Sequence, residues 1–137
     1  MKNIIVFSLL SIVLIVSCKD SSTDTEPTFR GSWEFSYING FTDSRVYPID
    51  SQNKFSWQDS SLVTDYSVEP FSMKKIYYDI VGSVSVDGIL SAEIFISGSH
   101  TKSGTFTGTL TNKDGSGSFL YNALQSEIYG TWTAVKK

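Results

Sequence analysis

The sequence has 137 residues, with 11 Lys and Arg against 14 Asp and Glu, so its formal net charge is −3. A chain of this length has room for one domain with a real core, and its acidic balance offers no basic face for nucleic acid. Its single cysteine and single histidine provide no metal-ligand spacing. We therefore expect one domain with no nucleic-acid partner, no metal and no cofactor.

The N-terminal segment combines a cationic start with an apolar run. Lys2 is followed by residues 4–16, which are apolar apart from two serines, and the run ends at Ser17 and the only cysteine, Cys18. The run is too short for a transmembrane helix, which needs roughly 20 apolar residues. This pattern is typical of an export signal. An ordinary secretory signal with a chance cysteine is the alternative.

The stretch Leu14-Ile15-Val16-Ser17-Cys18 resembles the lipobox of bacterial lipoproteins. The resemblance implies cleavage before Cys18, attachment of acyl chains such as palmitate, and a membrane anchor in the bacterial cell envelope, at the outer membrane or the cell surface. Two acyl chains give stable anchoring where one is marginal. Residues 1–17 are therefore expected to be a signal peptide, and the polar residues 18–28 to be the lipidated cysteine and a flexible tether.

After the tether, residues 29–137 show a period of two and no sustained helical period. This pattern predicts an all-β domain. The first strand is expected over residues 29–37, with Trp33, Phe35 and Tyr37 on one face. Asn39-Gly40 follows and suits a tight turn.

Residues 41–75 are the least regular part of the domain, and three short strands are expected there. Pro48 cannot donate a ladder hydrogen bond, so it indicates an edge strand or a bulge. Pro70 indicates a break before the next long strand.

The clearest hairpin signal is Asp87-Gly88, which lies between the alternating segments 76–86 and 89–97. The remaining strands are expected over residues 105–111, 116–122 and 128–135. The connection before the last of them, residues 123–127, could hold a single helical turn.

These segments amount to about eight strands joined mostly by short turns, so neighbouring strands should pair as a meander. An open sheet exposes two edges, and closure into a barrel removes both. Glycine at inward positions fits closure, because tight bends and close aromatic packing need a missing side chain; these positions are Gly82, Gly108, Gly117 and Gly130. The expected fold is an antiparallel up-and-down β-barrel, with a β-sandwich as the alternative.

The first and last strands repeat a Gly-small-Trp triplet, as Gly31-Ser32-Trp33 and Gly130-Thr131-Trp132. The first triplet resembles the Gly-x-Trp signature of lipocalins, and the pair is similar to the wider calycin group, which includes the avidins. No biotin site is carried over, because the contact pattern does not match. The resemblance implies a barrel whose mouth binds a small apolar or amphipathic ligand. The candidate lining residues are Trp33, Phe35, Tyr37, Phe106, Phe119, Tyr121 and Trp132.

A filled barrel is the alternative, because eight strands are just wide enough for side chains to fill the interior or to leave room for one small ligand. The domain would then be a non-enzymatic structural or protein-interaction module of the envelope. Aromatic residues in loops suit interfaces, and the candidates within 41–73 are Phe41, Tyr47, Phe55, Trp57, Tyr66 and Phe71. The exposure of Trp57 distinguishes an interface residue from a core residue, because an interface anchor is exposed in the isolated domain.

No pattern in the sequence indicates catalysis. His100 lies among Gly, Ser, Thr and Lys, with no acid or nucleophile near it in the sequence. The chain has no Gly-x-Ser-x-Gly motif and no phosphate loop. The turns at Asp87 and Asp114 lack the number of oxygen ligands that a calcium loop needs. We therefore expect no enzymatic activity.

Overall fold

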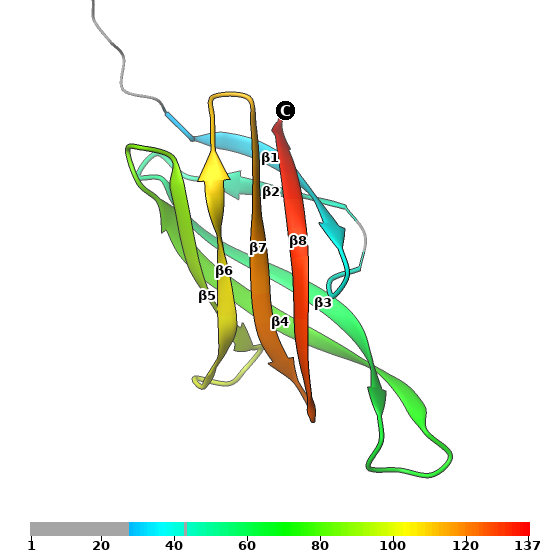
Figure 1. The fold of residues 1–137 in the computed structure, drawn as a ribbon. Helices are drawn as coiled ribbons and strands as arrows, with labels where there is room; N and C mark the ends of the chain where they lie inside the picture. Colours follow the sequence, from blue (N-terminus) through cyan, green and yellow to red (C-terminus); the bar gives the residue numbers. More distant parts are fainter. Residues whose placement is uncertain (1–27, 43) are drawn as a thin grey trace, which may run out of the picture.

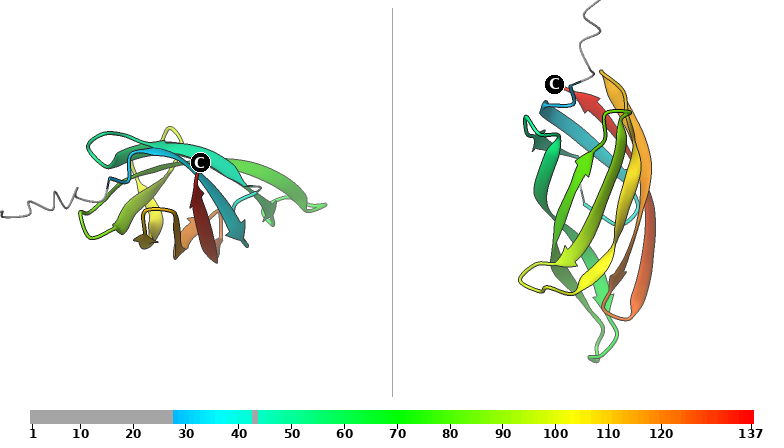
Figure 2. Two further views of the ribbon diagram at one scale, coloured as in Figure 1. Left: turned by 90° about the horizontal axis from the view of Figure 1, so that it is seen from above. Right: turned by 90° about the vertical axis from the view of Figure 1, so that its left-hand side faces the viewer.

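A computed structural model describes residues 28–42 and 44–137. Eight antiparallel strands form a single sheet, which curls into a nearly closed barrel (Figures 1 and 2). The structure confirms the predicted all-β barrel. No helix in the described residues is long and apolar enough to cross a membrane.

The strands follow one another round the barrel in a meander. Their bounds are β1 (Gly31–Ile38), β2 (Arg45–Ile49), β3 (Lys54–Asp65), β4 (Ser72–Val84), β5 (Ile89–Ile96), β6 (Lys102–Leu110), β7 (Asp114–Ala123) and β8 (Ser126–Lys136). The order in the sheet is β2-β1-β8-β7-β6-β5-β4-β3. The first and last strands of the barrel are therefore neighbours, as predicted, with Tyr37 opposite Trp132.

The irregular region differs from its prediction of three short strands. It holds β2 and the 12-residue strand β3, and β4 starts at Ser72. The length of β3 was missed because three successive polar residues, Asp59, Ser60 and Ser61, are buried in it and interrupt the apolar alternation. Pro48 lies in β2, which pairs only with β1 and is therefore an edge strand, as predicted.

The connection before the last strand also differs from its prediction. No helical turn lies within residues 123–127, because β7 runs to Ala123 and β8 starts at Ser126. Leu124 adopts a left-handed φ of 54° in the tight turn between them. The segment is therefore the end of a hairpin.

Aromatic side chains fill the centre of the barrel. The ring centroid of Phe35 lies 4.7 Å from that of Trp57 and 5.2 Å from that of Trp132. Phe106 stacks on Trp132 at 5.2 Å with an interplanar angle of 7°. Gly117 admits this indole, because a Cβ atom there would lie 2.6 Å from Trp132 Cε2. The interior is therefore a packed core at this level.

Side chains close the barrel between β2 and β3, which no strand ladder joins. Trp57 Nε1 donates a hydrogen bond to the Pro48 carbonyl at 2.9 Å. Tyr47 donates its hydroxyl to the Asp59 carboxylate at 2.6 Å. Backbone contacts just before β2 also join this seam, where Phe41 forms an isolated bridge with Ser61 and Thr42 N donates to the Ser60 carbonyl at 3.1 Å.

The hairpin of β3 and β4 is longer than its neighbours. β5 pairs with β4 only from Tyr78 to Val84, whereas β3 pairs with β4 as far as Asp65 and Ser72. We call residues 62–77 the β3–β4 arm. It projects past the other strands at the end of the barrel opposite the C-terminus (Figure 1). Thr28 lies near the C-terminal end, where Lys136 Nζ donates to its carbonyl at 3.0 Å.

Candidate functional site

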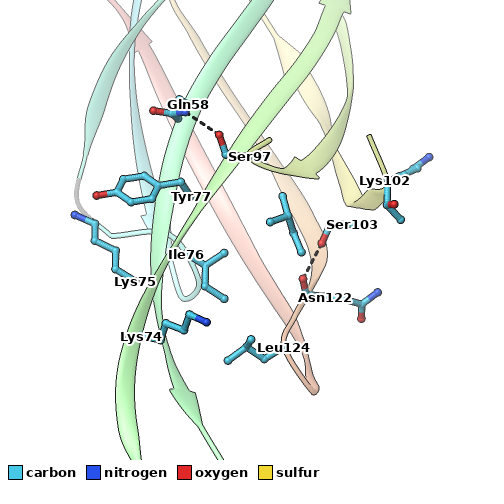
Figure 3. A pocket seen from close by; sticks show the side chains of 12 residues that line it. Gln58, Lys74, Lys75, Ile76, Tyr77, Ser97, Lys102, Ser103, Asn122 and Leu124 are labelled. Carbon is cyan, nitrogen blue, oxygen red and sulfur yellow. Dashed lines mark hydrogen bonds between the residues drawn. The ribbon is translucent and has the colours of Figure 1, made fainter. Parts of the chain in front are cut away.

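A groove of about 780 Å³ lies beside the arm (Figure 3). It opens where β5 ends and β4 continues without it, so β4 forms one wall and the ends of β6 and β7 form the other. Ile76 supplies apolar surface on the β4 wall and Leu124 on the opposite wall. Ser103 Oγ donates to the Asn122 carbonyl at 2.7 Å and so fixes the rim there.

The groove is positively charged although the chain as a whole is acidic. Its lining residues include Lys74, Lys75 and Lys102 and no Asp or Glu. Lys102 pairs with Glu93 at 2.9 Å, and Lys75 Nζ lies 5.5 Å from the centroid of the Tyr77 ring. Within the described part of the chain, Lys74 and Lys75 have no carboxylate within ion-pair distance. These two lysines can therefore neutralise an acidic partner.

The wall of the groove also contains a free strand edge. In an antiparallel pair the N–H and C=O of one residue point to the same side of the strand, and this side alternates along the chain. The Tyr77 carbonyl points toward β5, because it accepts a hydrogen bond from Ser97 N at 2.9 Å. The backbone groups of Met73 and Lys75 therefore point to the same side, beyond the end of the β4–β5 ladder.

The arm carries large apolar side chains in solvent. On its outer face Leu62, Met73 and Tyr77 are at least half exposed. At its tip the rings of Tyr66 and Phe71 meet edge to face at 5.2 Å, and both side chains are more than half exposed. One hairpin thus combines an apolar face, two lysines and an unpaired backbone edge.

The seven aromatic residues predicted to line a ligand site lie in the core. Six of them are at most 2% exposed, and Tyr37 is partly buried with its hydroxyl inside the barrel. None of the seven lines the groove. Their role in binding a ligand stays a prediction, and their packing against one another favours the filled-barrel alternative.

The six aromatic residues predicted to bind a partner divide into two groups. Tyr66 and Phe71 are exposed at the tip of the arm. The other four are 3–7% exposed and face the core, namely Phe41, Tyr47, Phe55 and Trp57. Trp57 is therefore not an exposed anchor. The sequence did not predict Leu62, Met73 and Tyr77 as residues of the partner surface. Met73 and Tyr77 alternate with Lys75 along β4, so the three lie on the same face of the strand.

Asp59 is a buried carboxylate at the seam. Besides Tyr47, the Ser60 amide donates to it at 2.7 Å, and Arg45 Nε lies 3.5 Å away. Burial raises the pKa of Asp59 above its usual value, and this effect outweighs the hydrogen bond from Tyr47 and the charge of Arg45, which lower it. Asp59 therefore links the closure of the barrel to pH.

Asp59→Asn should change how stability depends on pH. A carboxyl whose pKa is raised by folding stabilises the fold fully below its unfolded pKa of about 3.9, and this contribution is lost as pH rises through the folded pKa. The asparagine does not titrate. The unfolding free energy of the variant minus that of the parent should therefore increase as pH rises. Urea unfolding at a series of pH values from about 3.5 upward measures this difference.

Asp87→Asn, in the exposed turn between β4 and β5, controls for the loss of one carboxyl charge. A variant whose unfolding free energy falls relative to that of the parent as pH rises would contradict the raised pKa of Asp59.

His100 is exposed in the connection between β5 and β6. It lines a hollow together with Asp79 and Ser99. Asp79 instead accepts hydrogen bonds from Gln58 Nε2 at 3.2 Å and from Ser97 Oγ at 3.1 Å. Within the described part of the chain, no hydrogen bond joins His100 to Asp79 or to Ser99.

Cys18 and the predicted signal peptide lie outside the described residues. Among residues 28–42 and 44–137, no three side chains of His, Cys, Asp or Glu are grouped so that they could hold a metal ion. The described part of the chain is a nearly closed β-barrel with aromatic side chains packed at its centre and a projecting two-stranded arm. Comparisons with family models, with curated proteins and with solved structures gave no match to this chain.

Proposed function

We propose that this chain is a lipid-anchored, non-enzymatic protein of the bacterial envelope that binds another protein through the β3–β4 arm. The filled barrel serves as a rigid support for the arm. The observation that carries the proposal is the exposure of apolar side chains along the arm, of which Phe71 is 58% and Met73 62% exposed.

Such exposure is costly for an isolated chain. Water disfavours large apolar side chains, and a hairpin of only two strands is marginally stable by itself. Contiguous exposed apolar patches on soluble proteins are often interaction sites, and Tyr, Phe and Met are enriched at interfaces. Tyr66, Phe71 and Met73 provide these residue types on one element. A partner that covers the arm would shield its apolar side chains from water and would stabilise the two-stranded hairpin.

The position of the arm suits a tethered protein. The proposed anchor, Cys18, precedes Thr28 in the chain, and Thr28 lies at the end of the barrel opposite the arm (Figure 1). An anchor on that side leaves the arm projecting away from the membrane. This geometry supports the proposal that the arm is presented to a partner in the surrounding compartment.

The groove supports a second candidate function, the binding of a small amphipathic anion. Its volume of about 780 Å³ lies within the range of roughly 300–1,000 Å³ typical of ligand sites. Ile76 and Leu124 would contact the apolar part, and Lys74 the acidic group. This candidate keeps the predicted class of ligand and moves its site from the barrel mouth to the side wall.

Photo-crosslinking in living cells tests the proposed partner surface. A photoreactive residue at position 71 or 73 should give a discrete covalent adduct with another protein. Positions 89 and 135 are the matched controls, because Ile89 and Val135 are 55% and 54% exposed and lie outside the arm. The proposal requires adducts from the arm alone. Equal labelling at all four positions, or none at the arm, would contradict it.

A further inference from the structure

We propose that the partner contributes an extended acidic segment that pairs as a strand with the free edge of β4. This inference rests on the proposed function of the arm. The segment carries the pattern apolar-acid-acid-apolar opposite residues 73–76. Its backbone continues the β4 side of the sheet beyond the end of β5, and its side chains enter the groove on one face and cover the arm on the other.

The backbone supplies the first part of the argument. Within the described chain, β4 pairs with β5 no further than Tyr78, apart from the hydrogen bond from Ser97 N to the Tyr77 carbonyl. The N–H and C=O groups of Met73 and Lys75 are thus available on the groove side of β4. Free edges of this kind are templates for an added strand. An extended segment would satisfy both residues with main-chain hydrogen bonds.

The side chains determine the pattern of the segment. Successive residues of a strand point to opposite faces, so Lys74 shares the inward face with Ile76, and Lys75 shares the outer face with Met73. Residues directly opposite each other in paired strands interact, and opposite charges stabilise the pair. Acidic residues therefore fit opposite both lysines, and apolar residues fit opposite Met73 and Ile76. The pattern reads the same in either strand direction.

The same charges disfavour a second copy of this chain as the occupant. Two β4 edges paired antiparallel over residues 73–76 would place lysines of one copy beside lysines of the other, and like charges across strands are destabilising. Lysine on an edge strand prevents such self-pairing. An acidic segment removes the repulsion and uses the same two residues for recognition.

The test uses the full chain in lipid nanodiscs and three synthetic peptides. The first contains Val-Glu-Glu-Val within a short threonine-flanked strand, and the second contains Val-Lys-Lys-Val in the same frame. The third has the acidic sequence with N-methyl groups on alternate amides, so that it keeps the charges but cannot form the ladder. Fluorescence anisotropy measures binding, and hydrogen exchange measures protection of residues 72–77.

Only the unmethylated acidic peptide should bind, and it should slow amide exchange at Met73 and Lys75. Lys74→Glu with Lys75→Glu should weaken its binding by about tenfold or more and favour the lysine peptide, because two opposite-charge pairs become like-charge pairs. Lys54→Glu with Lys113→Glu is the matched control, since both lysines are exposed and neither lines the groove. This control should leave binding of the acidic peptide nearly unchanged.

Equal binding of the methylated peptide would overturn strand pairing, as would binding without protection at residues 72–77. Absence of binding by the acidic peptide would also overturn strand pairing. The two lysines would then serve only to prevent self-pairing of the β4 edge. These outcomes are distinct from failure of the proposed function. Crosslinks from position 71 would persist if the partner contacts the arm through side chains alone, and they would vanish if the arm binds no protein.

Discussion

Phe35→Ala is expected to lower the free energy of unfolding by about 3–5 kcal/mol, the range for a large aromatic side chain removed from a packed core. Phe35 is fully buried, and its ring contacts Trp57 on the β3 side of the seam and Trp132 on β8. Its loss leaves a cavity and separates the two sides of the seam. Equilibrium unfolding in urea measures the change.

Phe71→Ala is the matched control, because the same atoms are removed from a side chain that is 58% exposed. Surface substitutions usually change stability by less than about 0.5 kcal/mol, so the control should unfold like the parent. A loss of less than about 1 kcal/mol for Phe35→Ala would contradict a tightly packed interior.

Cys18→Ser is expected to abolish the incorporation of labelled palmitate and to release the protein from the membrane fraction. Acylation needs the thiol, which the hydroxyl of serine does not replace, and without acyl chains no apolar anchor remains on residues 18–28. Metabolic labelling followed by separation of membranes from soluble protein measures both effects.

Ser17→Ala is the matched control for the anchor, because it keeps a small side chain beside the scissile bond and leaves the cysteine in place. It should be labelled and retained on membranes like the parent. Labelled palmitate on the Cys18→Ser protein would contradict the lipobox assignment.

The sequence predicted the barrel because alternation and tight turns are local signals. The Asp87-Gly88 hairpin was correct for this reason. The pairing of the first and last strands followed instead from closure of the meander, which removes both edges of the sheet. The full length of β3 was not predicted, because Asp59 and Ser61 occupy inward positions where alternation requires apolar residues. Their burial depends on tertiary contacts such as the hydrogen bond from Tyr47 to Asp59. Sequence periodicity cannot report contacts of this kind.

The candidate site could be predicted only in part. Six aromatic residues were assigned to one partner surface; of these, Tyr66 and Phe71 are exposed, whereas residues such as Trp57 face the core. The face of Trp57 follows from the register of β3, which the irregular pattern obscured. The groove exists because β5 is shorter than the hairpin beside it. This difference in length comes from the pairing of three strands, so no single segment of the sequence encodes it.

If the barrel is a filled support, binding takes place outside it. Diffraction from a crystal of the chain pressurised with xenon shows whether the interior is filled, because xenon enters dry apolar cavities. We expect no xenon among Phe35, Phe106 and Trp132, whose rings already meet at centroid distances of 5.2–6.1 Å. A xenon atom bound between these rings would contradict a filled interior and return the search for a ligand to the barrel interior.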